Sequence, residues 1–375
     1  MNSYDVIVIG VGGMGSSACY HLSKRGYRVL GLEQFNLGHH FGSSHGETRM
    51  IRRAYFEHSN YIPLLNRAYE LWKDLETESK QSIFIPCGLV IYADPKTSAV
   101  YQGTLKSAQK YKIELKKWDR PTAIKKFPIY LPAENQRALF EPEAGLLHVE
   151  RAVLTHTSVA KQFGAQILEN VKVLDYEILN SCVKVRTNQG VFEAAKLVVT
   201  SGPWSGALLK ELGLPLKLHR LYQHWFKASP KHRLENAVPC FAFHSDEDFY
   251  YGFPMLDGKT IKIASHFSRE TLLNPSEKDA LVIPEEKIDA VRNFIKKSLP
   301  LVTTDLDRIS SCIYTMTPDE HFIIDTHPEI NSLVFAAGFS GHGFKFSSVT
   351  GEILADLTLE GKTKYPIDFL SLKRF

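Results

Sequence analysis

Three glycines near the N-terminus, Gly10, Gly12 and Gly15, have the spacing that dinucleotide binding requires. The first makes a tight turn, the second lets the backbone approach a pyrophosphate, and the third lets a helix pack closely on a strand. The following helix would offer its N-terminal N–H groups to the phosphates. Glu33 follows Gly10 by 23 residues and can accept a hydrogen bond from a ribose hydroxyl. We therefore predict a dinucleotide site; the alternative is a glycine-rich turn without a ligand.

This spacing does not distinguish FAD from NAD. Its place at the start of the chain favours FAD, because only the C-terminal segment completes the domain. There, an apolar run at residues 333–337 leads into the glycine-rich residues 338–344. A helix start after such a loop can direct N–H dipoles at an isoalloxazine ring, which becomes anionic on reduction.

Four cations and one thiol are the other candidates for chemistry. Arg49 and Arg52 lie three residues apart; such arginines are commonly solvated or ion-paired, but a guanidinium also binds a carboxylate bidentately. Lys345 lies at a helix start, where a cation is unfavourable unless an anion accompanies it. Lys262 lies in an alternating strand, whose pattern alone directs it toward water. Cys312, taken alone, is typical of a buried strand thiol.

The periodicity of apolar residues, together with the positions of Gly and Pro, predicts the helices and strands that position these residues. Strands are predicted at residues 4–9, 28–32, 83–92, 165–169, 195–200, 222–227, 241–243, 249–252, 260–265, 309–315, 321–324 and 333–337. Helices are predicted at residues 16–25, 59–77 (with Ser59 as N-cap), 149–163, 284–297 and 346–359. The two ends of the chain are typical of a doubly wound α/β arrangement, and the aromatic-rich residues 216–268 predict an antiparallel sheet in a second domain.

Composition limits the function classes. A chain of 375 residues suggests two domains, and a net charge of +4 gives no reason to expect nucleic acid as a partner. Apolar runs are strand-sized, so no membrane span is expected. The five cysteines lack CxxC or zinc-ligand spacing, so no metal site is predicted. The N-terminus lacks a secretory pattern and the C-terminus is not Ser-Lys-Leu, so a cytoplasmic location is expected.

Four blocks of sequence carry a specific resemblance. They are GVGGMG (10–15), GSSHGETRMIR (42–52), SCIYTMTPDEHF (311–322) and GFSGHGFKFSS (338–348). In this order the chain resembles the monomeric sarcosine oxidase family, which includes N-methyl-tryptophan oxidase and the pipecolate/sarcosine oxidases. The resemblance implies an α/β fold: a Rossmann-like FAD-binding domain of the glutathione-reductase type, and a second α+β catalytic domain built on a large mixed sheet. It also implies a monomer.

The expected domains are discontinuous. Residues 1–80, 145–215 and 325–375 would form the FAD-binding domain, and residues 81–144 and 216–324 the catalytic domain.

The resemblance also implies residue roles. Cys312 would carry FAD through an 8α-thioether, Arg52 and Lys345 would bind a substrate carboxylate, and Lys262 would promote the reaction with O2. The implied catalytic set is Lys262, Arg52, Lys345, His266, Arg49, His45 and Tyr314. The implied cofactor-binding set is Gly10, Gly12, Gly13, Met14, Gly15, Glu33, Ser43, Arg49, Val173, Gly202, Cys312, Gly341, Gly343, Phe344 and Lys345. Tyr250 and Tyr251 are candidate pocket walls beside Tyr314.

The implied reaction is oxidation of a carboxylated secondary amine, such as sarcosine, by FAD and O2. It gives an imine, then amine and aldehyde products, and H2O2. Residues 241–248 depart from the sarcosine oxidase pattern, which leaves L-pipecolate or proline as alternative substrates. A flavin dehydrogenase with another acceptor, an NAD-dependent dehydrogenase and a non-catalytic flavoprotein are the other functions considered.

Overall fold

The computed structural model describes residues 4–179, 182–245, 248–267, 269–280 and 282–375. Residues 246 and 247 of the 241–248 stretch lie outside this description. Among the described residues, no helix has both the length and the hydropathy needed to cross a bilayer.

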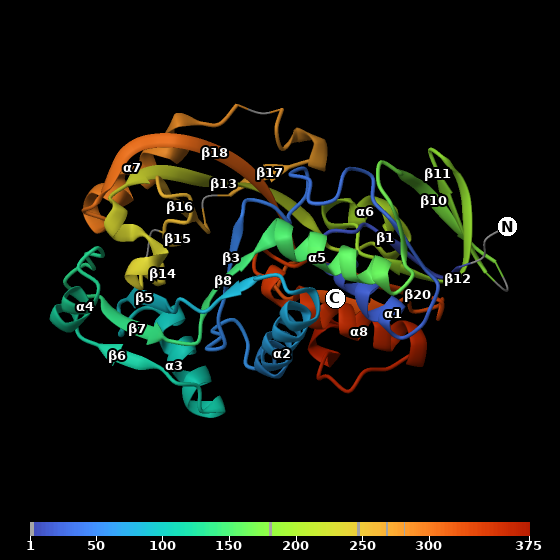
Figure 1. Ribbon diagram of the computed structural model, residues 1–375, viewed down its shortest axis with the longest axis horizontal. Coiled ribbons are helices and arrows are strands. Elements are labelled where there is room, and N and C mark those ends of the chain that lie inside the picture. Colours follow the sequence, from blue (N-terminus) through green and yellow to red (C-terminus); the bar gives the residue numbers. More distant parts are fainter. Residues whose placement is uncertain (1–3, 180–181, 246–247, 268, 281) are drawn as a thin grey trace.

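An eight-stranded sheet contains β1, the first strand of the described chain (Figure 1). Its core is parallel, with β1 at the centre between β2 and β12, while the hairpins β10–β11–β12 and β19–β20 are antiparallel. Its strands are β1 (Tyr4–Ile9), β2 (Val29–Leu32), β9 (Gln166–Leu168), β10 (Val173–Ile178), β11 (Val183–Thr187), β12 (Gly190–Val199), β19 (Ile323–Thr326) and β20 (Leu333–Ala337). The predicted β1–helix–β2 unit is confirmed.

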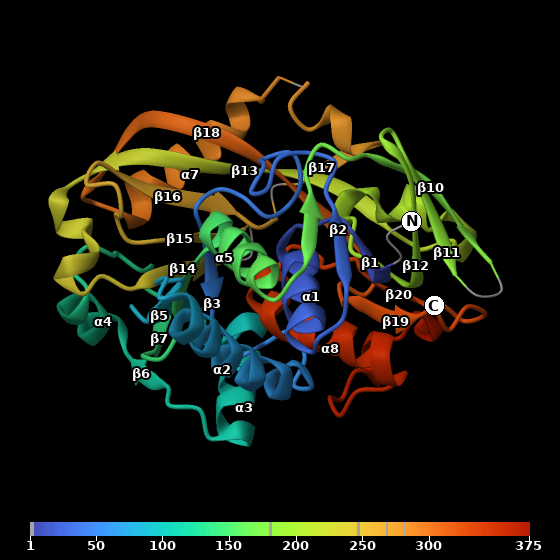
Figure 2. The same cartoon turned by 45° about the vertical axis from the view of Figure 1, so that its right-hand side comes forward.

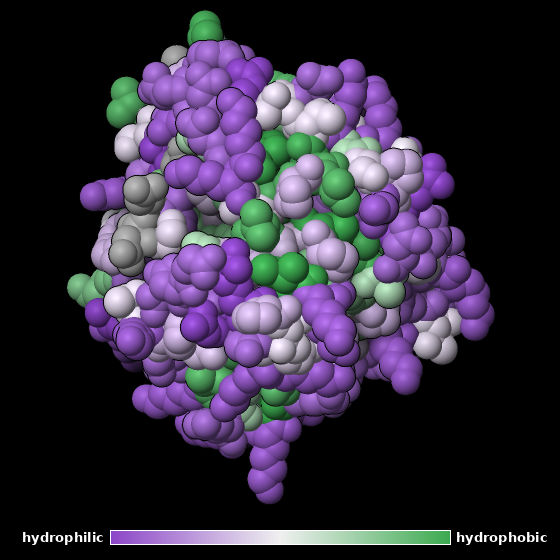
Figure 3. All heavy atoms as spheres, turned by 90° about the vertical axis from the view of Figure 1, so that its left-hand side faces the viewer, coloured by the Kyte–Doolittle hydropathy of each residue, from purple (hydrophilic) through white to green (hydrophobic). Residues whose placement is uncertain are grey.

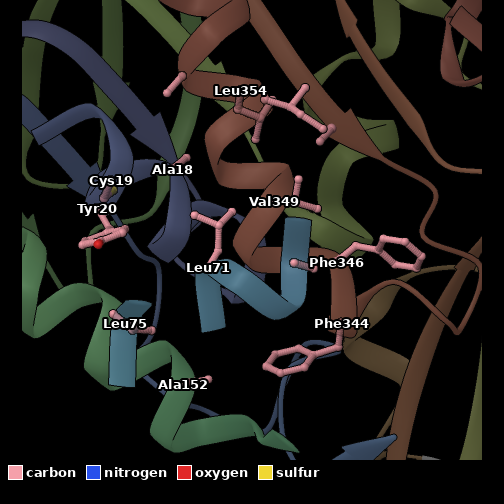
Figure 4. Close-up of a cluster of buried hydrophobic side chains, with 14 of the residues drawn as sticks. Ala18, Cys19, Tyr20, Leu71, Leu75, Ala152, Phe344, Phe346, Val349 and Leu354 are labelled. Atoms are coloured by element: carbon pink, nitrogen blue, oxygen red, sulfur yellow. The ribbon is translucent and has the colours of Figure 1, made fainter. Parts of the chain in front are cut away.

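Four long helices pack on one face of this sheet. Val6 and Val8 point into their core, whereas the alternate residues Ile7 and Ile9 pack on the other face against strand and loop residues. The helices are α1 (Gly13–Lys24), α2 (Tyr61–Ser79), α5 (Val149–Gln162) and α8 (Ser347–Glu360). Figure 4 shows this core, with residues from all four helices. The doubly wound expectation is therefore wrong in detail, because the hairpin β10–β11 lies where a second helix layer was expected (Figure 2).

A nine-stranded mixed sheet forms the other half of the described fold. The antiparallel order β13–β16–β15–β14 confirms the aromatic-rich sheet, but β14 pairs in parallel with β5 and extends it. Its strands are β5 (Leu89–Ala93), β6 (Lys116–Trp118), β7 (Arg137–Glu141), β13 (Lys217–Ala228), β14 (Cys240–His244), β15 (Phe249–Gly252), β16 (Thr260–Ser265), β17 (Glu270–Leu272) and β18 (Val302–Met316). The accompanying helices are α3 (Ala99–Tyr111), α4 (Arg120–Lys126) and α7 (Glu285–Ser298).

The far end of this sheet has partly exposed apolar side chains. Figure 3 views the end that carries α4 and α7, where hydrophobic side chains lie in a recess framed by hydrophilic ones. The core beneath α4 and α7 includes the partly buried rings of Trp118, Phe127, Phe140 and Tyr250.

A small third sheet contains the Arg49 end of the 42–52 block. Strand β3 (Thr48–Ile51) pairs with β8 (Gly145–His148), which also pairs with β4 (Phe84–Ile85). The predicted strand at 83–92 is therefore two strands, because Pro86 and the positive φ of Gly88 interrupt it. Ser59 is not the N-cap of α2; Asn60 holds that position, and the Ser59 hydroxyl accepts a hydrogen bond from Lys110 instead.

Candidate active site

A cavity of about 500 Å³ lies where the glycine loop, the small sheet and the nine-stranded sheet meet. This volume is within the range of ligand and cofactor sites. The predicted residues that line it are Gly10, Gly12, Gly13, Met14, Glu33, Ser43, Arg49, Arg52, Val173, Gly202, His266, Cys312, Tyr314, Gly341, Gly343, Phe344 and Lys345. Gly15, His45 and Lys262 lie outside the lining.

The glycine loop has the close contacts that its sequence predicts. A Cβ on Gly10 would lie 2.7 Å from the Thr200 carbonyl oxygen, and one on Gly15 would lie 1.8 Å from the Gly10 carbonyl oxygen. At Gly12, by contrast, the nearest atom would be Ser44 Oγ at 3.7 Å. Helix α1 has no side-chain cap on its N-cap residue and no acid in its first turn, and its Gly13 N donates to Ser44 Oγ at 3.1 Å.

Replacing Gly15 by Ala is expected to destabilise the protein by about 3 kcal/mol, because the added methyl group would overlap the Gly10 carbonyl. Thermal unfolding would measure the loss. Gly206→Ala is the matched control, since a Cβ there meets nothing within 4 Å and alanine favours a helix. Equal unfolding midpoints for the two variants would contradict the close helix–strand packing.

Glu33 directly follows β2 and is buried beneath the loop. Its Oε2 accepts a hydrogen bond from Val11 N at 2.9 Å, and its Oε1 accepts one from Phe35 N at 3.1 Å. The side chain therefore fixes the loop in this structure. A carboxylate offers about four acceptor positions, so capacity for a ribose hydroxyl remains.

Two buried cations, Arg52 and Lys345, lie at the other end of the cavity. Arg52 Nη2 contacts both carboxylate oxygens of Glu57, at 2.7 and 2.9 Å, and its guanidinium lies over the rings of Tyr55 and Phe56. Lys345 Nζ donates to the His342 carbonyl at 2.5 Å. Burial, together with the charge of Arg52, lowers the pKa of Lys345 to about 7. Lys345 lies in a short 3₁₀ turn before α8, not in the helix itself.

Glu57 and His342 line this end of the cavity and were not predicted from the sequence. Glu57 binds the Arg52 guanidinium, and the carboxylate of a ligand could bind the same guanidinium in place of Glu57. His342 Nδ1 lies 2.5 Å from the Tyr55 hydroxyl. An acid five residues after Arg52 was the available sequence signal for Glu57.

Cys312 is on the cavity wall in β18, 2% exposed, with its Sγ 3.4 Å from Arg49 Nη2. Arg49 also donates to the Ser43 carbonyl at 3.0 Å, and Ser43 Oγ donates to the Ile313 carbonyl at 2.7 Å. The loop at residue 43, the arginine and the thiol therefore form one connected wall.

Three aromatic or imidazole side chains form the wall beside the cations. His266 Nδ1 lies 3.3 Å from the Tyr314 hydroxyl, and Tyr251 also lines the cavity. Burial lowers the pKa of His266 to about 3, so its ring is neutral at ordinary pH. Tyr250 was expected to form a pocket wall as well, and this expectation is wrong. Alternation along β15 turns Tyr250 away from the cavity, and its ring stacks on Phe294 at 4.3 Å between centroids.

Lys262 and His45 lie behind the cavity wall. Lys262 Nζ donates to the carbonyls of Gly46 and Thr48, both at 2.7 Å, and is 5% exposed, so the water-facing reading of its strand is wrong. Burial holds the pKa of Lys262 well below 10.5. His45 is 2% exposed, and burial with the charge of Arg49 lowers its pKa to about 2.

The described residues fit FAD. The glycine loop and Glu33 provide a dinucleotide cradle, and the Thr315 hydroxyl lines the cavity without a hydrogen-bond partner among the residues described. The dinucleotide end and the cationic end belong to one continuous cavity, which an extended cofactor can occupy.

The comparisons agree with this geometry. Residues 5–357 match the FAD dependent oxidoreductase family. Monomeric sarcosine oxidase of Bacillus sp. (strain B-0618) is 37% identical over 99% of this chain and 96% of its own. N-methyl-L-tryptophan oxidase of Yersinia pestis (strain Pestoides F) is 35% identical over 99% of each chain.

Two solved structures share the fold. NikD, an amino acid oxidase of nikkomycin biosynthesis, superposes with a TM-score of 0.87 at 24% identity, covering 99% of this chain and 98% of its own. L-proline dehydrogenase from P. horikoshii gives 0.86 at 23% identity, covering 100% and 98%. The family match gives FAD, and not NAD, as the cofactor: the chain belongs to the FAD-dependent oxidoreductases, with monomeric sarcosine oxidase among its homologues.

Proposed function

We propose that the protein oxidises a carboxylated secondary amine, sarcosine or another N-methyl amino acid, with FAD and O2. The product imine hydrolyses to an amine and an aldehyde, and O2 leaves as H2O2. The observation that carries the proposal is the pair of buried cations, Arg52 and Lys345, in the same cavity as the dinucleotide cradle. The names of the curated relatives support the substrate class and a monomer.

In this proposal the chain's own residues bind and orient the substrate. Arg52 exchanges Glu57 for the substrate carboxylate, and Lys345 supplies the second positive charge. Tyr251 and Tyr314 form the wall near the amine, where π faces suit either an amine or an ammonium. Because His266 is neutral, it adds no charge that would repel an ammonium.

We propose that FAD lies along the cavity from Glu33 to Lys345, with its phosphates at the N-terminus of α1. When bound, FAD supplies the oxidising chemistry, taking two electrons from the C–H bond beside nitrogen and delivering them to O2. Cys312 is the proposed attachment point, through an 8α-thioether. We propose that the FAD-binding domain is built on the eight-stranded sheet and the catalytic domain on the nine-stranded sheet.

The direct test is anaerobic mixing of the purified protein with sarcosine, N-methyl-tryptophan, L-pipecolate, L-proline and a primary amino acid, followed by air. Bleaching of the flavin band at about 450 nm by an N-methyl amino acid, with rapid recovery in air, supports the proposal. Bleaching by L-pipecolate or L-proline instead would establish the cyclic substrate class. Bleaching without recovery in air would establish a dehydrogenase, and a yellow protein that none of them bleaches would contradict the substrate class.

Substrate binding is expected to weaken as pH rises through about 7. Below its pKa of about 7 Lys345 is a charged ammonium that attracts a carboxylate, and above it the amine is neutral. Deprotonation of Lys345 should therefore lower kcat/KM by up to about tenfold for each pH unit above 7. The control is Lys345→Met, which keeps the titration of the substrate's own amine but should lack this decrease. If the decrease persists in Lys345→Met, another group causes it.

Lys262→Met is expected to slow oxygen consumption by about 100-fold, because a fixed, buried cation stabilises negative charge as it develops on O2. Rapid mixing of the reduced enzyme with O2 separates this effect from amine oxidation. Lys259→Met, on the same hairpin but exposed, controls for the change in net charge. Unchanged oxygen reactivity in Lys262→Met would remove the proposed role and favour a dehydrogenase.

A further inference from the structure

We propose that Cys87 and Cys240 are a redox-active thiol pair that hydroperoxides convert into a reversible disulfide. The two Sγ atoms lie 3.7 Å apart in the structure, and both thiols are free. Neither thiol lines the cavity, so neither takes part in the proposed binding of FAD or substrate.

The backbone holds the two thiols together. Cys87 lies in the turn between β4 and β5, where Gly88 N donates to the Ala144 carbonyl at 2.7 Å. Cys240 opens β14, and its N donates to the Gly88 carbonyl at 3.0 Å. These bonds fix the chain beside both thiols, and forming a disulfide shortens the sulfur–sulfur distance from 3.7 Å to about 2 Å.

The two thiols have different environments, which assigns them different roles. Cys87 is partly exposed, and its hydrogen bond with Cys240 lowers the pKa of the Cys87 thiol. Cys240 is fully buried, and burial raises the pKa of its thiol well above 9. Cys87 therefore carries the attacking thiolate, and Cys240 resolves the product.

The chemistry balances with H2O2 as oxidant. The Cys87 thiolate attacks one peroxide oxygen, an S–O bond forms as the O–O bond breaks, and the leaving hydroxide takes a proton to become water. The Cys240 sulfur then attacks the Cys87 sulfur, the S–S bond forms, the S–O bond breaks, and a second water leaves. Two thiols lose two electrons in total, and one peroxide becomes two waters.

The proposed amine oxidation supplies this oxidant, and to that extent the inference rests on the proposed function. The source is close: Cys87 and Cys240 belong to one apolar cluster with Phe56, Phe249 and Tyr251, and those three rings also line the cavity. The apolar cluster that contains the thiol pair therefore borders the cavity in which H2O2 would form. A disulfide here would tie the β4–β5 turn, next to the small sheet that carries Arg49, to β14.

The test uses the reduced holoenzyme in two arms, one with added H2O2 and one turning over with its amine substrate, with and without catalase. Free thiols are alkylated, and peptides are mapped without reduction. We expect a peptide pair joined through Cys87 and Cys240 in both arms, its loss with catalase in the turnover arm, and its reversal by dithiothreitol. Cys182, another partly exposed thiol, is the internal control and should remain alkylated. Cys87→Ser should abolish the joined pair, whereas Cys182→Ser should leave it unchanged.

The proposal would be overturned by added H2O2 that leaves Cys87 and Cys240 fully alkylated, or by Cys87 oxidised to a sulfinic acid with Cys240 still free. Oxidation of Cys182 as fast as Cys87 would also overturn it, because the pair would then have no special reactivity. A joined pair with added H2O2 but none during turnover would support the thiol pair and count against the proposed release of H2O2. The wild-type readout does not depend on either variant folding.

Discussion

Arg52→Gln is expected to lower kcat/KM for a carboxylated amine by about 100-fold or more. Arg52 is 6% exposed, and losing one partner of a buried charge pair costs about 2–5 kcal/mol, with a tenfold change in rate for each 1.36 kcal/mol or so. The structure adds a second penalty. Without the guanidinium, Glu57 remains at the cavity as an uncompensated carboxylate and repels the substrate carboxylate.

The measurement compares the amino acid with the same amine lacking its carboxylate. Arg52→Gln should lose most of its activity on the first and little on the second, and the double variant Arg52→Gln/Glu57→Gln should recover part of the loss by removing the repulsion. Arg53→Gln is the matched control, because Arg53 lies outside the cavity and pairs with the exposed Glu143. Equal losses on both amines would show that Arg52 supports the fold and does not select a carboxylate.

The spacing of glycines and apolar residues predicted the part of the site that is built by elements adjacent in the sequence. The β1–α1–β2 unit and its glycines depend on contacts between neighbouring elements, such as the one that excludes a Cβ at Gly15. Cys312 and Tyr314, by contrast, were predicted only through the family resemblance; both line the cavity, together with Ile313 and Thr315 of the same strand. The family resemblance added the chemical meaning of these positions, which spacing alone could not give.

The missed features depend on partners distant in the sequence. Alternation placed Lys262 on one face of β16, but only the loop that carries Gly46, 216 residues away, determines that this face is covered. The same limit applies to the β14–β5 pair, which joins segments about 150 residues apart and makes the sheet mixed. The hairpin β10–β11 covers a sheet face on which the doubly wound expectation implied helices; no element was predicted from the sequence between residues 169 and 195.

Cys312→Ala is expected to abolish covalent attachment of the flavin completely. When the wild-type protein is denatured in acid, the yellow colour should stay with the precipitate; with Cys312→Ala it should pass into the supernatant. The reason is geometric: the Cys312 sulfur lies on the cavity wall, 3.4 Å from Arg49 Nη2.

Cys240→Ala is the control for this experiment, because Cys240 is also a buried strand thiol in the nine-stranded sheet but lies outside the cavity lining. It should retain the flavin in the precipitate. Arg49→Met should slow attachment without abolishing it, since the nucleophile remains but loses its neighbouring charge. If Cys312→Ala kept the flavin after denaturation, another residue would be the attachment point; if the wild type released it, Cys312 would line a site that holds FAD only by the glycine loop and its surrounding contacts.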